Sequence, residues 1–256
     1  MRITFLGTNG WFATEKGNTI CTLIETAGRY IVLDAGDGIR RLMESAPDQT
    51  KPLDIFISHF HLDHIIGLHQ LNRFHYRRIR IFVQPEGKRI VDFIVNKPFT
   101  DALESLPNVE VKELAIGRNK VSDGLGSYSV DVAWLSHADP CIGFRFELLD
   151  KGRKKVVAHC LDSGPCDAIK GLSAGADLMI AECGNLPGEG EDPAWPHMSP
   201  EIAAGLALEA KAKTLVLTHF AAHKYPAPKD RKAACKAAKE VFARTTCASD
   251  GLTIEI

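Results

Sequence analysis

Ser58-His59-Phe60-His61-Leu62-Asp63-His64 is the stretch of this 256-residue chain that decides its fold and its chemistry. It directly follows residues 54–57, which are expected to form a buried strand, and it precedes a helical pattern at 64–75. Its three imidazoles and one carboxylate are donors that bind divalent metal ions. Residues at a strand end and at a helix start point in two adjacent directions. The stretch therefore predicts two neighbouring metal ions, with solvated loop histidines as the alternative.

Two metal ions need more ligands than one short motif supplies. His137, Asp162 and His219 each follow a run that predicts a strand. Taken singly, each has an ordinary interpretation, as a polar surface histidine or as an aspartate that caps a turn. Their common position after predicted strands favours a shared site with the histidine-rich stretch.

The remaining pattern predicts short strands that alternate with helices. Runs at 2–6, 20–25 and 29–33, separated by glycine-bearing turns, indicate an antiparallel meander. Further strands are expected at 79–83, 109–113, 127–134, 142–148, 154–158, 178–181, 214–217 and 253–256, and helices at 38–45, 86–96, 166–172, 199–210 and 229–243. This order favours two packed sheets with helices outside. The glycine- and proline-rich residues 184–198 predict a long loop, and such loops are often functional.

Composition limits the classes of protein and partner. Apolar residues make up 45% of the chain and charged residues 25%, which indicates a globular protein, and one domain over residues 1–256 is expected. The net charge of −1 argues against attraction of the whole surface to nucleic acid or to a membrane. A local basic run at 73–80 could grip RNA, although a solvated face is the favoured interpretation. Seven cysteines without framework spacing, no signal peptide and no apolar run of about 18 residues predict a cytoplasmic protein without a membrane partner.

The pattern His-x-His-x-Asp-His, with a later His, Asp and His, resembles the metallo-β-lactamase superfamily. The resemblance runs from Phe5-Leu6-Gly7-Thr8 to His219 and implies an α/β fold, a four-layer αββα sandwich with a dinuclear site at one edge. In that pattern one metal ion is held by His59, His61 and His137, the other by Asp63, His64 and His219, and Asp162 bridges them. Asp34 would orient a ligand, with a plain turn aspartate as the alternative. The imidazoles favour two zinc ions, and the carboxylates leave manganese or iron open.

Within the superfamily, the sequence most resembles the ribonuclease Z-like phosphodiesterases. The resemblance is carried by Phe5-Leu6-Gly7-Thr8-Asn9-Gly10, Leu33-Asp34-Ala35-Gly36-Asp37-Gly38, Glu182, His197-Met198-Ser199-Pro200 and Leu217-Thr218-His219. In that branch the residues matching Glu182 and His197 form a relay that gives a proton to the departing oxygen. Asp63, His197 and Glu182 are therefore the expected catalytic residues, with an ordinary loop histidine and a surface glutamate as the alternatives.

Two departures from that branch bear on the substrate. Only 24 residues separate His137 from Asp162, where ribonuclease Z carries a long tRNA-clasping insertion. Phe220-Ala221-Ala222-His223-Lys224-Tyr225 replaces the usual Ser-x-Arg-Tyr. We therefore do not expect tRNA as a partner. We expect a phosphodiesterase that uses a metal-activated water on small or cyclic nucleotide-like diesters or on RNA ends.

Other functions and partners stay open at this stage. The alternatives are a metal-dependent hydrolase of a lactone or thioester and a non-catalytic metal-binding module. A homodimer is expected by family analogy only. Trp195, close to His197 in the predicted loop, could stack on a base, cover the pocket or simply pack.

Overall fold

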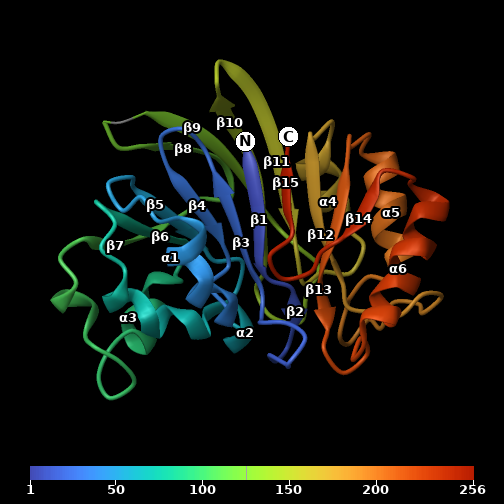
Figure 1. Cartoon of the computed structure of the whole chain (residues 1–256), viewed down its shortest axis with the longest axis horizontal. Coiled ribbons are helices and arrows are strands. Elements are labelled where there is room, and N and C mark those ends of the chain that lie inside the picture. Colours follow the sequence, from blue (N-terminus) through green and yellow to red (C-terminus); the bar gives the residue numbers. More distant parts are fainter. Residues whose placement is uncertain (125) are drawn as a thin grey trace.

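The computed structural model describes residues 1–124 and 126–256 and has two mixed β-sheets with helices against their outer faces (Figure 1). This confirms the four-layer αββα arrangement. The two ends of the chain meet in one sheet, because β1 (Arg2–Gly7) pairs antiparallel with β15 (Thr253–Glu255). Among the described residues, none of the helices combines the length and the apolar composition needed to cross a membrane.

The first sheet carries the N-terminal half of the chain. Its strand order is β15, β1, β3 (Cys21–Glu25), β4 (Tyr30–Leu33), β5 (Leu53–Phe56), β6 (Ile79–Val83) and β7 (Val109–Glu113). β1, β3 and β4 pair antiparallel, as the meander predicted, whereas β4 to β7 are parallel. The helical segments of this half are η1 (Asp37–Arg41), α1 (Leu42–Ser45), α2 (Leu62–Ile65), η2 (Ile66–Arg73), α3 (Lys88–Ile94) and η3 (Leu103–Ser105). The helix expected at 64–75 is therefore one α-helical turn followed by a 3₁₀ segment.

The second sheet carries the C-terminal half. Its order is β14 (Thr245–Cys247), β13 (Leu215–Ala221), β12 (Leu178–Cys183), β11 (Arg153–Cys160), β10 (Ile142–Asp150), β9 (Ser127–Trp134) and β8 (Gly117–Ser122), and β2 (Asn9–Gly10) pairs with β13. The helices of this half are α4 (Asp167–Ser173), α5 (Pro200–Glu209) and α6 (Pro228–Val241). Sequence patterns missed β2, β8 and β14. β2 and β14 have only two and three residues, and β8 is mostly polar.

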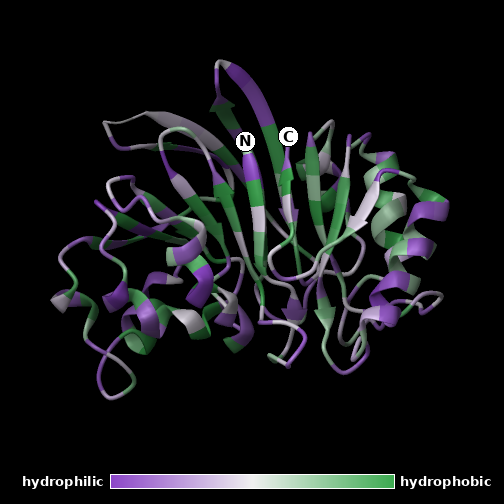
Figure 2. Ribbon diagram, in the orientation of Figure 1, coloured by the Kyte–Doolittle hydropathy of each residue, from purple (hydrophilic) through white to green (hydrophobic). Residues whose placement is uncertain are grey.

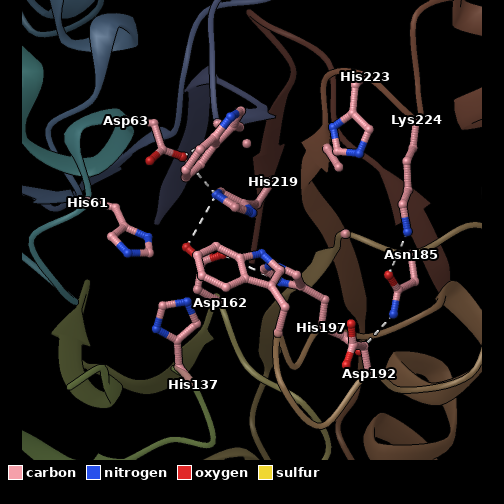
Figure 3. A pocket seen from close by; sticks show the side chains of 15 residues that line it. His61, Asp63, His137, Asp162, Asn185, Asp192, His197, His219, His223 and Lys224 are labelled. Atoms are coloured by element: carbon pink, nitrogen blue, oxygen red, sulfur yellow. Dashed lines mark hydrogen bonds and ion pairs between the residues drawn. The ribbon is translucent and has the colours of Figure 1, made fainter. Parts of the chain in front are cut away.

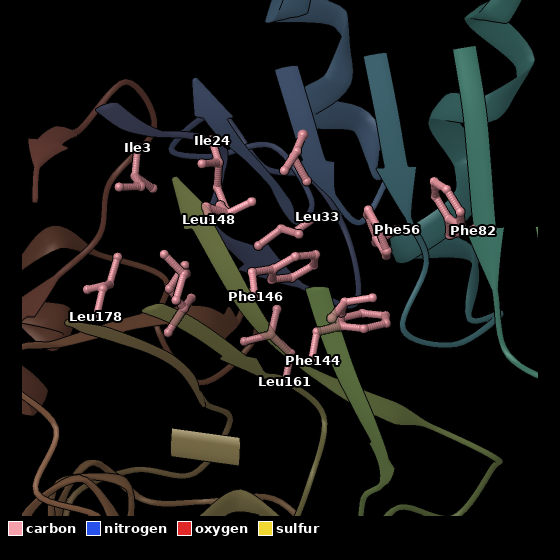
Figure 4. Packing of buried hydrophobic residues seen from close by; sticks show 14 of the residues in the cluster. Ile3, Ile24, Leu33, Phe56, Phe82, Phe144, Phe146, Leu148, Leu161 and Leu178 are labelled. Carbon is pink, nitrogen blue, oxygen red and sulfur yellow. The ribbon is translucent and has the colours of Figure 1, made fainter. Parts of the chain in front are cut away.

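One hydrophobic cluster lies between the two sheets, and further clusters lie between each sheet and its outer helices. Figure 4 shows Phe56 of the first sheet packed toward Phe144 and Phe146 of the second. The ring centroid of Phe56 lies 5.6 Å from that of Phe144 and 4.9 Å from that of Phe146, both with edge-to-face geometry. Burial of each such side chain contributes about 1.5–3 kcal/mol. Hydrophobic residues accordingly concentrate on the central strands, and hydrophilic residues on the outer helices and loops (Figure 2). This packing fixes the edge of one sheet against the edge of the other.

One member of the predicted basic run has a structural role instead. Arg80 is only 1% exposed, and its Nε and Nη2 donate to Asp54 at 2.7 and 2.8 Å. Asp54 also accepts hydrogen bonds from Arg29 at 2.9 Å and from the Tyr128 hydroxyl at 2.8 Å. Removal of one member of such a buried ionic cluster leaves an uncompensated charge. Arg80 is thus unavailable to a ligand, and the basic surface run is smaller than the sequence suggested.

Candidate metal centre

The predicted site residues lie at or just beyond the ends of strands that run in the same direction. Asp34 follows β4, His59 follows β5, His137 follows β9, Asp162 follows β11, and His219 lies near the end of β13. The carboxyl ends of parallel strands meet at one edge of a sheet, which is where ligand sites of α/β proteins form. Because the two sheets face each other, these two edges meet as well.

The structure brings all seven predicted ligand residues together. Candidate ligand atoms lie within 4.8 Å of one another in two triads, which are His59, His61 and His137, and Asp63, His64 and His219. Asp162 lies between the triads, with its Oδ2 2.6 Å from His64 Nε2, 3.5 Å from His59 Nε2 and 3.3 Å from His219 Nε2. Figure 3 shows His61, Asp63, His137, Asp162 and His219 around one pocket. These are the groupings that the resemblance implied.

Several candidate ligand atoms lack the hydrogen-bond partners that buried polar atoms normally have. Nε2 of His59 and Nε2 of His137 are buried and have no hydrogen-bond partner among the described residues. His64 Nε2 and His219 Nε2 face each other at 3.1 Å. Buried polar atoms are normally satisfied in folded proteins. The convergence of unsatisfied imidazole nitrogens with two carboxylates fits a site for divalent metal ions.

The electrostatics of the pocket favour positive charge. Burial alone would raise the pKa of Asp162, but the surrounding histidines, His219 first, hold that pKa well below its ordinary value. Conversely, burial would lower the pKa of His64, but the neighbouring aspartates, Asp34 first, raise that pKa well above its ordinary value. The carboxylates thus stay ionised and attract cations into the pocket.

Asp34 makes the contacts expected of a residue that orients a ligand. Its side chain is fully buried, and its Oδ1 accepts a hydrogen bond from Ser58 N at 2.8 Å. Its Oδ2 accepts from Ser58 Oγ at 3.1 Å and lies 3.1 Å from His64 Nδ1. With Nδ1 occupied in this way, Nε2 of His64 faces the other candidate ligands.

Three of these residues have strained backbones. Asp34, Asp162 and His219 have φ angles of 58°, 46° and 50°, in the left-handed region that non-glycine residues rarely adopt. Gly10 lies so close to the site that an added Cβ would be 2.5 Å from His219 Cε1. Such strain concentrates at functional sites, where the surrounding structure holds it in place.

Glu182 and His197 form a hydrogen-bonded pair beside the triads. Glu182 is fully buried, and its Oε1 accepts hydrogen bonds from His197 Nδ1 at 2.8 Å and from Ser163 N at 2.7 Å. His197 Nδ1 also lies 3.7 Å from Asp162 Oδ1. Burial lowers the pKa of His197, but attraction to Glu182 and their hydrogen bond outweigh it and raise that pKa to about 9. The sequence predicted this pair, and the structure shows that loop 184–198 carries His197 to it.

Sequence reasoning did not single out Asp139 or Trp11, which both lie at the site. Asp139 Oδ2 lies 2.9 Å from His61 Nε2, and its position two residues after His137 was a signal that could have found it. Trp11 lines the pocket, and its backbone N donates to Asp63 Oδ2 at 2.7 Å. No local pattern marks Trp11, because its loop is brought to the site by tertiary contacts such as the pairing of β2 with β13.

Comparisons with known proteins agree with this geometry. The family model described as "Beta-lactamase superfamily domain" matches residues 29–220. Ribonuclease Z from Methanosarcina acetivorans is 27% identical, and the alignment covers 100% of this chain and 98% of that protein. Among solved structures, the metallo-beta-lactamase fold protein YhfI from Bacillus subtilis has a TM-score of 0.79 at 20% identity and covers 99% of both chains. The short form of human tRNase Z has a TM-score of 0.71 at 23% identity and covers 100% of this chain and 99% of that one. The chain therefore belongs to the metallo-β-lactamase superfamily and has ribonuclease Z-like homologues over its full length.

Proposed function

We propose that this protein is a metal-dependent phosphodiesterase acting on small or cyclic nucleotide-like diesters or on RNA ends. The observation that carries the proposal is the Glu182–His197 hydrogen bond of 2.8 Å beside two ligand triads. The triads alone would suit many hydrolases of the superfamily. A buried carboxylate that fixes a histidine next to them adds a proton donor, which an ester with a poor leaving group requires.

The ligand assignment follows the two triads. His59, His61 and His137 would hold one divalent ion and Asp63, His64 and His219 the other, with Asp162 between them and zinc favoured by the imidazoles. Bound there, two such ions supply charge neutralisation for an anionic diester and make hydroxide available near neutral pH.

His197 would act on the leaving oxygen of the ester. Its Nδ1 is engaged by Glu182, so Nε2 is the ring nitrogen left for a substrate. Glu182 is itself held by the backbone N–H groups of Ser163 and Gly184, at 2.7 and 2.8 Å. A histidine positioned for proton transfer contributes typically 10²–10⁴-fold to the rate.

Three observations support a small substrate. The cavity at the site has a volume of about 240 Å³, below the roughly 300–1,000 Å³ typical of small-molecule sites. The segment between His137 and Asp162 consists mainly of the single β10–β11 hairpin. The alignment with the Methanosarcina acetivorans protein spans 314 positions, so that relative carries residues that this chain lacks. The proposal therefore does not include tRNA as a substrate, and the expectations about tRNA, the homodimer and the absence of a membrane partner stay predictions.

The first experiment compares substrate classes. The protein would be loaded with Zn²⁺ or Mn²⁺, its metal content measured, and its activity assayed on bis(p-nitrophenyl) phosphate, cyclic nucleotides, lactones and thioesters. Diester hydrolysis with two bound ions is the expected result. Turnover confined to a lactone or thioester would replace the proposal with that alternative. Binding of metal without turnover of any class would indicate a non-catalytic module.

The second experiment tests the proton donor. His197→Ala should retain both metal ions and lose rate, most for esters with alkoxide leaving groups and least for those that release p-nitrophenol. His75→Ala is the matched control, because His75 is exposed and lies outside the pocket. Equal losses on good and poor leaving groups would rule out the acid role of His197.

A further inference from the structure

Two tryptophans stay exposed at the pocket although burial would stabilise them. Trp11 is 59% exposed and Trp195 is 42% exposed, and both line the cavity of the candidate metal centre. They come from distant parts of the chain, the loop after β2 and the loop 184–198. Large aromatic side chains gain much free energy when buried, so two half-exposed indoles at one pocket need a reason.

The two indoles form a corner beside the first triad. Their ring centroids are 6.1 Å apart and their planes are nearly perpendicular, at 89°. Trp195 is nearly parallel to the His61 ring, at 11° and 5.8 Å, and Trp11 meets the same ring edge-on at 6.1 Å. Trp195 also lies 5.9 Å from the His137 ring and 6.2 Å from the His197 ring. A flat ring stacked on the face of one indole that points away from His61 would lie beside the first triad.

Trp11 is held in position by its loop. Its φ of 76° is in the left-handed region that bulky residues rarely adopt, and its backbone N donates to Asp63 Oδ2 at 2.7 Å. Asn9 braces the same loop by donating to the carbonyl oxygens of Phe12 at 3.2 Å and Gly17 at 3.0 Å, and Arg231 in turn donates to Asn9. The indole is therefore presented at the pocket by a fixed backbone, and not by a loose surface turn.

Trp195 is set by contacts within its own loop. Its backbone N donates to the Asp192 carbonyl oxygen at 3.1 Å, and the preceding Ala194 N donates to Asp192 Oδ1 at 2.9 Å. Across the pocket from His61 lie His223 and Lys224 (Figure 3). The pocket thus has an aromatic corner next to the first triad and polar groups facing it.

We infer that Trp11 and Trp195 form a stacking subsite for the nucleobase of a small nucleotide-like phosphodiester. The inference rests on the proposed phosphodiesterase function and narrows its substrate class. Stacking on indole suits any base, because every base has a π-face, and it contributes roughly tenfold to a hundredfold per base. The small cavity matches one base and one phosphate group better than a folded nucleic acid.

The kinetic test uses two substrates with the same leaving group and charge, thymidine 5′-(p-nitrophenyl phosphate) and ethyl p-nitrophenyl phosphate, with the metal-loaded protein. Trp195→Leu and Trp11→Leu should each lower kcat/KM for the nucleoside ester roughly tenfold or more and that for the ethyl ester by less than about twofold. Trp195→Phe keeps an aromatic face and should retain most of the preference. Trp134→Leu is the matched control, because Trp134 is 44% exposed and lies outside the pocket.

A binding measurement separates failure of the subsite from failure of the proposed function. By calorimetry, adenosine 5′-monophosphate should bind the metal-loaded protein at least tenfold more weakly after Trp11→Leu/Trp195→Leu, with ribose 5-phosphate unaffected. If the wild type hydrolyses neither ester but the double variant binds adenosine 5′-monophosphate more weakly as expected, the phosphodiesterase proposal fails and the base subsite stands. Equal losses on both esters together with unchanged nucleotide affinity would overturn the subsite and leave the phosphodiesterase intact.

A third substrate, a short single-stranded oligoribonucleotide, distinguishes a small nucleotide from the end of an RNA chain as the ligand of this subsite. Losses confined to mononucleotide esters support a small nucleotide as the ligand. Losses of similar size on the oligoribonucleotide assign the same base-stacking subsite to the end of an RNA chain.

Discussion

Asp34→Asn tests whether a buried carboxylate sets the ligand atom that His64 presents. Asn tolerates the left-handed backbone at this position, where φ is 58°, so the substitution keeps the local shape. Ser58 N donates to Oδ1 of Asp34, which directs the new amide NH₂ toward His64 Nδ1 at the place of Oδ2, 3.1 Å away. A neutral His64 that accepts this bond carries its proton on Nε2, the atom that faces Asp63 and His219.

The size of the effect follows from the lost interaction. A hydrogen bond to a charged group contributes about 1.5–3 kcal/mol, and each 1.4 kcal/mol is a factor of ten in affinity. We therefore expect one of two bound Zn²⁺ equivalents to weaken about 10- to 100-fold, in line with other residues that orient metal ligands. The second equivalent, held by His59, His61 and His137, should be retained.

The assay is competition for Zn²⁺ with a chromophoric chelator, alongside the free energy of unfolding in urea. Asp54→Asn is the matched control, because Asp54 is equally buried but lies in the Arg29–Arg80 cluster and outside the pocket. It should lower the free energy of unfolding and leave the Zn²⁺ affinity unchanged. If Asp34→Asn binds both equivalents with wild-type affinity, the argument about His64 is wrong.

Three further predictions concern stability. Asp54→Ala should lower the free energy of unfolding by about 3 kcal/mol, because it removes the buried carboxylate that Arg29, Arg80 and Tyr128 share and leaves the two guanidinium groups with Asp123; a loss below about 1 kcal/mol in urea denaturation would contradict this. His159 is fully buried, and burial lowers its pKa to about 4, so the unfolded chain takes up a proton first as the pH falls. The free energy of unfolding therefore falls as the pH drops from about 6.5 toward 4. Between pH 7.5 and 5, the metal-free wild type should lose about 2 kcal/mol more of it than His159→Phe does. Parallel pH profiles of the two proteins would refute this prediction. Zn²⁺ at about 100 times its Kd should stabilise the protein by about 2.7 kcal/mol, reversibly on chelation, and an unchanged denaturation midpoint would count against a metal site.

Local patterns predicted most elements because each reports which face of a segment is apolar. β6 and β7 lie at the residues expected for them, and α5 begins with Ser199 as its N-cap and Pro200 at its first position. Apolar patterns did not predict strands that form through backbone pairing with a neighbouring strand and bury few side chains. β8 has one buried residue, Val121, and exists because it pairs with β9.

The sequence by itself determined the order of strands and helices and the placement of metal-competent side chains at or near strand ends. It could do so because apolar periodicity and residue chemistry are local properties of the chain. Only the tertiary structure decided which strand ends meet, that Arg80 is buried on Asp54, and that Trp11 lies beside Trp195. These contacts join residues that are far apart in the chain, and they form only when the packing of one sheet on the other brings their edges together.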